Sequence, residues 1–538
     1  MIITELQQLY AAHPNVEGMY RLLQDNSVRH LYCSGLCASA ASLFSSVLIQ
    51  RVECPFVFIL GDLEEAGYFY HDLTQILGTE QVLFFPSSFR RAIKYGQKDA
   101  ANEILRTEVL SRLQKGEEGL CVVTYPDALA EKVVSREELG DKTLKLHLGE
   151  KVDMDFVTEV LRSYSFEYVD YVYEPGQYAV RGSIIDVFSF SSEFPFRIDF
   201  FGDEVESIRT FEVESQLSKE KKENIVIVPD LSHSLEQRGN GGMVSFLDFL
   251  QPDTLLAMKD FLWLRERIQT VHDEALTAQA IAAREAEENG LISLDGKLID
   301  GGEFTLRALD FRRIEFGTKP TETPDATVTF NTTAQPIFHK NFDLVAESFH
   351  DYLSRNYALY ICSDSLKQTE RIRAIFEDRG DNISFTSVER TLHEGFADDA
   401  LRLCIFTDHQ LFDRFHKYNL KSDKARSGKV ALSLKELNQF TPGDYVVHTD
   451  HGVGRFTGLV RIPNGDTTQE VMRLVYQNDD VVFVSIHSLH KVSKYKGKEG
   501  EAPRLNKLGT GAWEKLKDRT KTKIKDIARD LIKLYSQR

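Results

Sequence analysis

The chain has 538 residues, of which 42% are hydrophobic and 27% charged, and its 65 Lys and Arg against 82 Asp and Glu give a formal net charge of −17. This composition is ordinary for a globular protein. It excludes collagen-like, coiled-coil and wholly disordered chains, and the length predicts roughly three to five domains. The negative charge argues against indiscriminate nucleic-acid binding by the whole chain, because phosphate affinity needs clustered cations, but it leaves room for a local basic segment.

No apolar run approaches the ~20 residues needed to cross a bilayer, and Met1–His13 lacks the basic and then apolar pattern of a secretory signal. The six cysteines are too few and too scattered for a disulfide framework. Only Cys33 and Cys37 are close together, without a second pair or a histidine cluster to complete a zinc site. We therefore expect a cytoplasmic protein with reduced, mostly buried thiols and no membrane partner.

Residues 1–144 alternate strand patterns with helix patterns, which predicts an open, mainly parallel sheet. The expected strands cover 30–33, 55–60, 81–85 and 119–124, and the expected helices cover 40–49, 63–77 and 100–115.

The segment Ser34–Phe44 lies between a predicted strand and a predicted helix, where a phosphate-binding loop would lie. It contains Gly35 and Ser39 but lacks the second glycine and the lysine of G-x-x-x-x-G-K-[ST]. Without that lysine, no point charge is available for the outer phosphates. We predict an inactive, degenerate nucleotide loop, in which small residues allow close packing.

Residues 145–230 are rich in strands, expected at 168–173, 178–190, 195–201 and 207–213, and they predict a small α+β domain inserted into or following the first one. Strand alternation in Phe196–Phe201 places Phe196, Ile198 and Phe200 on one face, and Arg197, Asp199 and Phe201 on the other. Aromatic and arginine side chains together are typical of protein–protein hot spots. Taken alone, the pattern also allows Phe201 to cover a neighbouring helix.

Helix patterns return at 245–290, and residues 231–330 are expected to complete the first domain. The Thr- and Pro-rich residues 317–335 predict a linker. Residues 336–428 predict a further α/β domain of unknown role, with helices at 342–355 and 365–378 and strands at 358–362, 383–386 and 401–407.

Residues 436–497 are dense in short strands and glycines, which predicts a small β-barrel whose edge strand, around Ile462, can add to a partner's sheet; an ordinary hairpin is the alternative. His448 and His451 flank a turn without a carboxylate or cysteine at ligand spacing, so we predict no metal site, and no motif predicts catalytic residues. Residues 505–538 predict a helix, basic over 510–538.

Three long stretches together resemble the N-terminal half of bacterial transcription-repair coupling factors (the Mfd family), over essentially the whole chain. YEPGQYAVRGSIIDVF (173–188) with PFRIDFFGDEVESIR (195–209) is similar to the UvrA-contacting domain shared with the repair protein UvrB. GDYVVHTDHGVGRFTGL (443–459) with DVVFVSIHSLHKVSKY (480–495) resembles the CarD-like module that binds RNA polymerase, an SH3/Tudor-like barrel. Residues 505–535 resemble the linker helix that precedes the motor in this family.

The resemblance implies a multi-domain α/β and α+β fold. Residues 1–144 and 231–330 would form a degenerate helicase-like (RecA-like), UvrB-like domain, interrupted by a UvrA-binding α+β domain at 145–230. The family's UvrA contacts correspond to Arg181, Arg197 and Phe201. Its contacts to the RNA polymerase β subunit correspond to Val460, Arg461 and Ile462, where Ile462 replaces an expected leucine of similar volume.

The family protein displaces stalled RNA polymerase, recruits UvrA for nucleotide excision repair, and moves on double-stranded DNA with an ATP-driven motor. The resemblance places that motor, with its ATP, Mg and most DNA contacts, after the linker helix, so no enzyme activity or cofactor is expected for this chain. The first alternative is a UvrB-like damage-verifying ATPase with a divergent nucleotide loop. A CarD-like regulator without repair partners is a second, but it leaves 440 residues unexplained.

Overall fold

The computed structural model describes residues 1–88, 100–213, 216–231, 243–285, 296–414, 441–448, 450–464, 467–485, 492–495 and 503–508, together with residues 416, 418, 420 and 513. Apart from 505–508 and Trp513, the predicted linker helix over 505–538 lies outside the described residues. Within the described ranges, no helix combines the length and apolar character needed to cross a membrane. All six cysteines are described and unpaired with one another, and four of them are buried, which confirms the expectation that most are buried.

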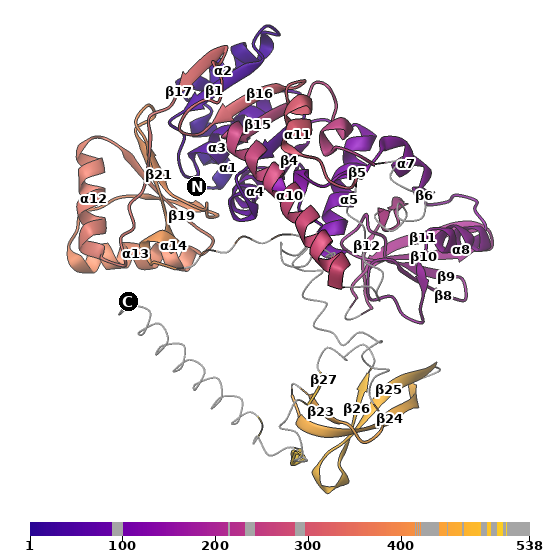
Figure 1. The fold of residues 1–538 in the computed structure, drawn as a ribbon. Helices are drawn as coiled ribbons and strands as arrows, with labels where there is room; N and C mark the ends of the chain where they lie inside the picture. The colour runs from indigo at the N-terminus through magenta and orange to yellow at the C-terminus, as the bar shows by residue number, and fades with distance from the viewer. Residues whose placement is uncertain are drawn as a thin grey trace.

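A seven-stranded parallel sheet forms what we call the first block, with strand order β17-β1-β16-β15-β2-β4-β3 (Figure 1). Every residue of β2 (FVFI) and β4 (CVVT) is buried, as expected for parallel strands covered on both faces. The strands are β1 His30–Ser34, β2 Phe56–Ile59, β3 Val82–Phe84, β4 Cys121–Thr124, β15 Leu255–Lys259, β16 Arg312–Phe316 and β17 Ala326–Thr329.

Helices of the first block pack in two groups: α1 to α4 contact one another, and α10 contacts α6 and α11. Their ends are set by local capping; Asp62, for example, accepts a hydrogen bond from the Glu65 amide at the start of α4. The helices are α1 Ile3–Tyr10, α2 Pro14–Gln24, α3 Ala40–Arg51, α4 Leu63–Leu77, α5 Ala100–Lys115, α6 Pro126–Leu129, α7 Arg136–Asp141, the 3-10 helix η2 Phe246–Phe249, α10 Phe261–Glu285 and α11 Gly301–Ala308; β5 Val133–Val134 pairs with β14 Met243–Val244.

Residues 144–231 form the central module, a six-stranded sheet of order β12-β11-β10-β9-β8-β7 in which only the β7–β8 pair is parallel. Helix α8 and the β6–β13 pair contribute to its separate apolar core. The elements are β6 Leu144–His147, α8 Met154–Ser163, β7 Glu167–Tyr168, β8 Gln177–Arg181, β9 Ile184–Val187, β10 Phe196–Phe201, β11 Glu204–Phe211, β12 Ser218–Lys221 and β13 Asn224–Ile227.

Residues 332–414 form the second block, a five-stranded sheet of order β18-β21-β22-β19-β20 with helices around it. It shares one apolar core with the first block, because Val388, Leu392 and Phe396 pack into the cluster built by α1, α3 and β1. The elements are β18 Thr332–Ala334, α12 Phe342–Ser354, β19 Ala358–Ser363, α13 Leu366–Arg379, β20 Thr386–Glu389, β21 Phe396–Asp398, β22 Leu403–Thr407 and α14 Asp408–Leu411.

The C-terminal module, described over 441–495 with gaps, is a five-stranded antiparallel sheet of order β26-β25-β24-β23-β27 (yellow in Figure 1). Its elements are β23 Tyr445–His448, β24 Gly452–Asn464, β25 Thr467–Val475, the 3-10 helix η4 Gln477–Asp479, β26 Val481–Ser485 and β27 Val492–Lys494. The α/β content with several sheets is thus confirmed, while the closed barrel and the domain boundaries stay predictions.

Several local expectations were wrong. The predicted linker 317–335 contains β17, which pairs with β1 in the main sheet, and β18. The stretch 245–290, predicted as helical, contains the buried strand β15, because a short apolar run does not distinguish a buried strand from a buried helix. In the predicted strand 168–173 only Tyr168 is in a strand, and the predicted strand 383–386 is shifted to Thr386–Glu389.

Candidate partner-binding surfaces

The strand β10 presents one large aromatic ring to solvent. Phe196, Ile198 and Phe200 are buried in the core of the central module, whereas Phe201 is 78% exposed, so the predicted alternation is confirmed. Phe201 pairs with Glu204 across the turn to β11, and Gly202 in that turn has a φ of 62°. An exposed phenylalanine at a hairpin end forgoes the burial that such a side chain usually gains. Together with nearby arginines, such a ring has the composition of a protein–protein hot spot.

Two arginines beside this strand share one buried carboxylate. Asp186 on β9 is fully buried and lies directly across from Arg197 on β10. The Arg197 Nε and Nη2 donate to Asp186 Oδ1 and Oδ2 at 2.7 and 2.9 Å, a bidentate pair. Arg181 at the end of β8 also pairs with Asp186. Two guanidinium groups on one carboxylate leave one net positive charge at this place.

The two arginines differ in how much they offer to a partner. The Arg197 side chain is 16% exposed and lies over the Phe211 ring, with its Nη1 donating to the Gln216 carbonyl at 3.1 Å. The Arg181 side chain is 37% exposed and lies over the Tyr171 ring. Arg197 is therefore held mainly by its own module, whereas Arg181 and Phe201 present more surface. Sequence reasoning missed Asp186. Its place between the apolar Ile185 and Val187 on one strand was the available signal, because alternation puts its side chain on the opposite face from theirs.

The strand predicted to bind polymerase has one free side in the structure. Beyond Phe456, β24 pairs with β25, with Val460 opposite Val471, and β23 pairs only with Gly452–Arg455. Among the described residues, no strand lies on the other side of Leu459–Asn464. Val460 is half-buried and Leu459 is 40% exposed. The backbone pairing of Arg461 and Ile462 is described, and their side chains lie outside the described residues.

The degenerate nucleotide loop is filled by the chain itself. Thr332 Oγ1 accepts from the Cys37 amide at 3.0 Å and donates to the Gly35 carbonyl at 2.6 Å. The Ser39 amide donates to the Glu394 carbonyl, and the Glu394 amide donates to Ser39 Oγ at 3.0 Å. Two backbone amides of the loop, those of Cys37 and Ser39, are thus bonded to residues of the second block and not free for a phosphate.

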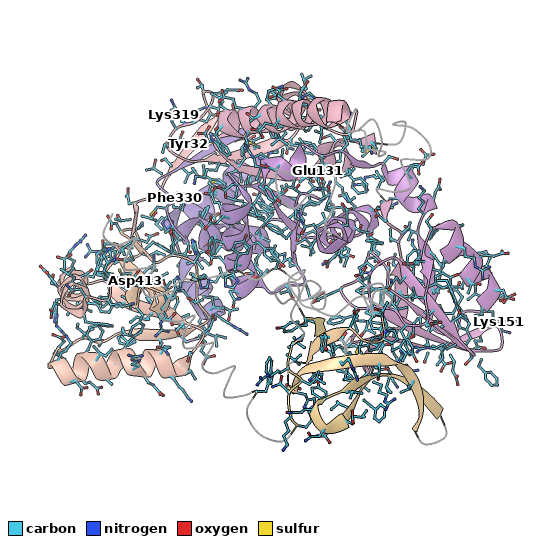
Figure 2. All side chains as sticks on the ribbon, turned by 60° about the horizontal axis from the view of Figure 1, so that its bottom comes forward. Tyr32, Glu131, Lys151, Lys319, Phe330 and Asp413 are labelled. Atoms are coloured by element: carbon cyan, nitrogen blue, oxygen red, sulfur yellow. The ribbon has the colours of Figure 1, made fainter. Side chains whose placement is uncertain are left out.

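Two further contacts fill the same part of the first block, which we call the nucleotide corner (Gly35, Ser39 and Asp72). The Phe330 carbonyl lies so near Gly35 that an added Cβ would be 2.0 Å from its oxygen; Figure 2 labels Phe330 where the two blocks meet. The buried Asp72 accepts from Ser42 Oγ at 2.8 Å and from the His393 amide at 2.7 Å. Burial raises the pKa of Asp72 to about 6 despite these hydrogen bonds. Nucleotide inactivity stays a prediction, and this packing supports it.

No group of three or more His, Cys, Asp or Glu side chains within the described ranges is arranged to hold a metal ion. His448 and His451 stack with ring centroids 4.6 Å apart, and His448 Nδ1 accepts from the Asp450 amide at 3.1 Å. These contacts are those of polar residues that fix a turn.

Comparison with known proteins finds a family model that matches each of the two modules carrying these surfaces. Residues 144–233 match the UvrB interaction domain, and residues 440–496 match the CarD-like/TRCF RID domain. The chain is 24% identical over 577 residues to the transcription-repair-coupling factor of Bacillus subtilis (strain 168), and 25% identical over 579 residues to that of Staphylococcus aureus (strain bovine RF122 / ET3-1). Each alignment covers 94% of this chain and 48% of the relative.

The chain therefore spans about half the length of the curated relatives it matches, namely their N-terminal half. The resemblance predicted from the three sequence stretches is confirmed.

Proposed function

We propose that this chain is the partner-binding part of a transcription-repair coupling factor. It recruits UvrA through the face formed by Arg181, Arg197 and Phe201, and it binds the RNA polymerase β subunit through Val460, Arg461 and Ile462. The observation that carries the proposal is Phe201, an aromatic ring 78% exposed in a module that matches the UvrB interaction domain. The free side of β24, in the module matching the CarD-like/TRCF RID domain, supports the second assignment.

The proposal assigns no catalytic residue, nucleotide or metal to these residues, and it places the chain in the cytoplasm. ATP-driven movement on double-stranded DNA, with Mg and the displacement of stalled polymerase, is assigned to the part of the relatives that this chain does not match. The UvrB-like ATPase alternative needs an open phosphate loop, and the bonding of Cys37 and Ser39 to Thr332 and Glu394 counts against it. DNA-stimulated ATP hydrolysis by this chain would favour that alternative.

UvrA capture tests the first surface. Phe201→Ala and Arg181→Ala are each expected to weaken capture of purified UvrA at least tenfold, because both remove exposed contact area and one removes charge. Tyr168→Ala is the matched control, since Tyr168 is a 59% exposed aromatic residue of the same module. Unchanged capture by the Phe201 variant, or equal loss in the control, would remove the assignment.

Binding of the polymerase β subunit tests the second surface. Ile462→Arg is expected to abolish binding because it places an unpaired charge in an apolar contact. Phe483→Arg is the matched control, because Phe483 is a 49% exposed aromatic residue on β26, away from β24 in the sheet. Retained binding by the Ile462 variant would point to another surface.

A further inference from the structure

Tyr173 joins two modules that are far apart in the sequence. It belongs to the central module, yet its side chain packs against the apolar core of the C-terminal module. That core consists of Val446, Phe456, Met472, Leu474, Tyr476, Val484 and Val492. The Tyr173 hydroxyl is inaccessible to solvent and has no hydrogen-bond partner among the described residues, so the contact described is apolar in character. Burial raises the pKa of Tyr173 accordingly.

The backbone of Tyr173 is fixed firmly in its own module. The amides of Tyr173 and Glu174 both donate to Gln177 Oε1 at 3.0 Å. The preceding residue, Val172, is fully buried, and its carbonyl accepts from Gln216 Nε2 at 3.4 Å. A contact made by such a rigid loop holds the C-terminal module in place at little additional cost in conformational entropy.

The same loop supports the two arginines of the candidate UvrA face. Tyr171 lies under the Arg181 guanidinium, with 5.1 Å from Cζ to the ring centroid. Arg197 donates to the carbonyl of Gln216, whose side chain bonds Val172. The positive charge of Arg181 offsets part of the rise that burial causes in the pKa of the Tyr173 hydroxyl. The contact with the C-terminal module therefore lies beside the face proposed for UvrA.

We propose that Tyr173 is an intramolecular latch that docks the C-terminal module beside the UvrA face and couples the two. A protein interface of ordinary size covers about 800 Å² on each partner, and one centred on Arg181 reaches the neighbouring Tyr173 loop. A partner that covers this loop must displace the docked module. Its measured affinity is then reduced by the fraction of molecules whose latch is closed. This inference rests on the proposed function only for the identity of that partner.

The contact itself is tested without any partner. A benzophenone-bearing residue at position 173 of the full chain is expected to cross-link, within one chain, to a peptide from 441–485. The same residue at position 168, an exposed tyrosine of the same module, is expected not to do so. Equal cross-linking yields at 173 and 168 would overturn the latch.

The coupling is tested with two substitutions at one position. Tyr173→Ala removes the ring and is expected to abolish docking and to tighten UvrA binding about fivefold or more. Tyr173→Phe keeps the ring and removes only a buried hydroxyl that bonds none of the described residues, so it is expected to leave docking and UvrA affinity as in the unaltered chain or to close the latch further. Docking is read from the radius of gyration by small-angle scattering.

The outcomes separate the latch from the proposed function. UvrA affinity that is unchanged by Tyr173→Ala, or Tyr173→Phe behaving like Tyr173→Ala, overturns the coupling. If no form of the chain captures UvrA, the proposed function fails, and the cross-link at position 173 still decides whether the latch exists.

Discussion

The nucleotide corner of the first block and the arginine–phenylalanine face of the central module differ in how much side-chain surface they leave exposed to a partner. At the corner, the groups around Ser39 and Asp72 are bonded to Glu394 and His393, more than 300 residues away in the sequence. On the face, Arg181 and Phe201 keep exposed surface. A surface whose groups find partners within the chain has little left for a ligand, so the comparison favours docking on the central module over chemistry in the first block.

A comparison of the two arginines separates the residue that supports the face from the residue that contacts a partner. Arg197→Ala is expected to lower the free energy of unfolding by about 3 kcal/mol, because it deprives the buried Asp186 carboxylate of its bidentate partner. Arg181→Ala is expected to cost no more than about 1 kcal/mol, since its side chain is over a third exposed. Denaturant titration of both variants measures this. Equal losses in the two variants would mean that Arg181 and Arg197 contribute equally to the stability of the module.

A comparison of two glycines tests how closely the nucleotide corner is filled. Gly35 and Gly149 both have positive φ, 80° and 76°, but only at Gly35 would a Cβ meet the Phe330 backbone. Gly149→Ala is expected to cost about 1 kcal/mol for the left-handed backbone alone. Gly35→Ala is expected to cost about 2 kcal/mol more, because the chain at Phe330 must move. The measurement is the free energy of unfolding of the two variants. Equal values would show that the backbone at Phe330 can move away from position 35 at little cost.

Acidic pH is expected to lower the stability of the contact between the first and second blocks. The pKa values of His71, His393 and His416, grouped where α4 meets the second block, are each lowered to about 4, chiefly by burial. Between pH 6.5 and 4 the unfolded chain therefore binds more protons at these groups, so their contribution to stability is lost as pH falls. Asp72, with its pKa raised to about 6, has the opposite sign and offsets part of this loss.

Denaturant titrations from pH 7 to pH 5 measure that slope. His416→Phe keeps the ring that stacks on His409, at 4.3 Å between centroids, and removes one titrating group. It is expected to flatten the decline in stability, whereas a variant of the exposed His147, His147→Phe, is expected to follow the unaltered chain. A pH dependence that is the same in all three proteins would locate the acid sensitivity elsewhere.

The sequence predicted more of the arginine–phenylalanine face than of the nucleotide corner, because the face depends on a local pattern and the corner on residues far apart in the chain. Alternation along β10 is local, so the outward position of Phe201 follows from six consecutive residues. The pairing of Asp186 with Arg197 depends on strand register, which those residues do not specify. The filling of the corner depends on Thr332 and Glu394, and no local pattern near Gly35 indicates them. The short edge strand β17 lies in a Thr- and Pro-rich stretch, where its few small residues resemble a linker.

The smallest effect on stability is expected at Phe201, a residue whose substitution is expected to weaken UvrA binding strongly. Phe201→Ala is expected to change the free energy of unfolding by less than about 0.5 kcal/mol, because a ring that is 78% exposed has little packing to lose. Phe200→Ala on the same strand removes a buried ring and is expected to cost about 3–5 kcal/mol. A Phe201 variant that loses UvrA while keeping its stability shows that the exposed ring acts as a contact. A substantial loss of stability in that variant would instead show that the ring supports its own module.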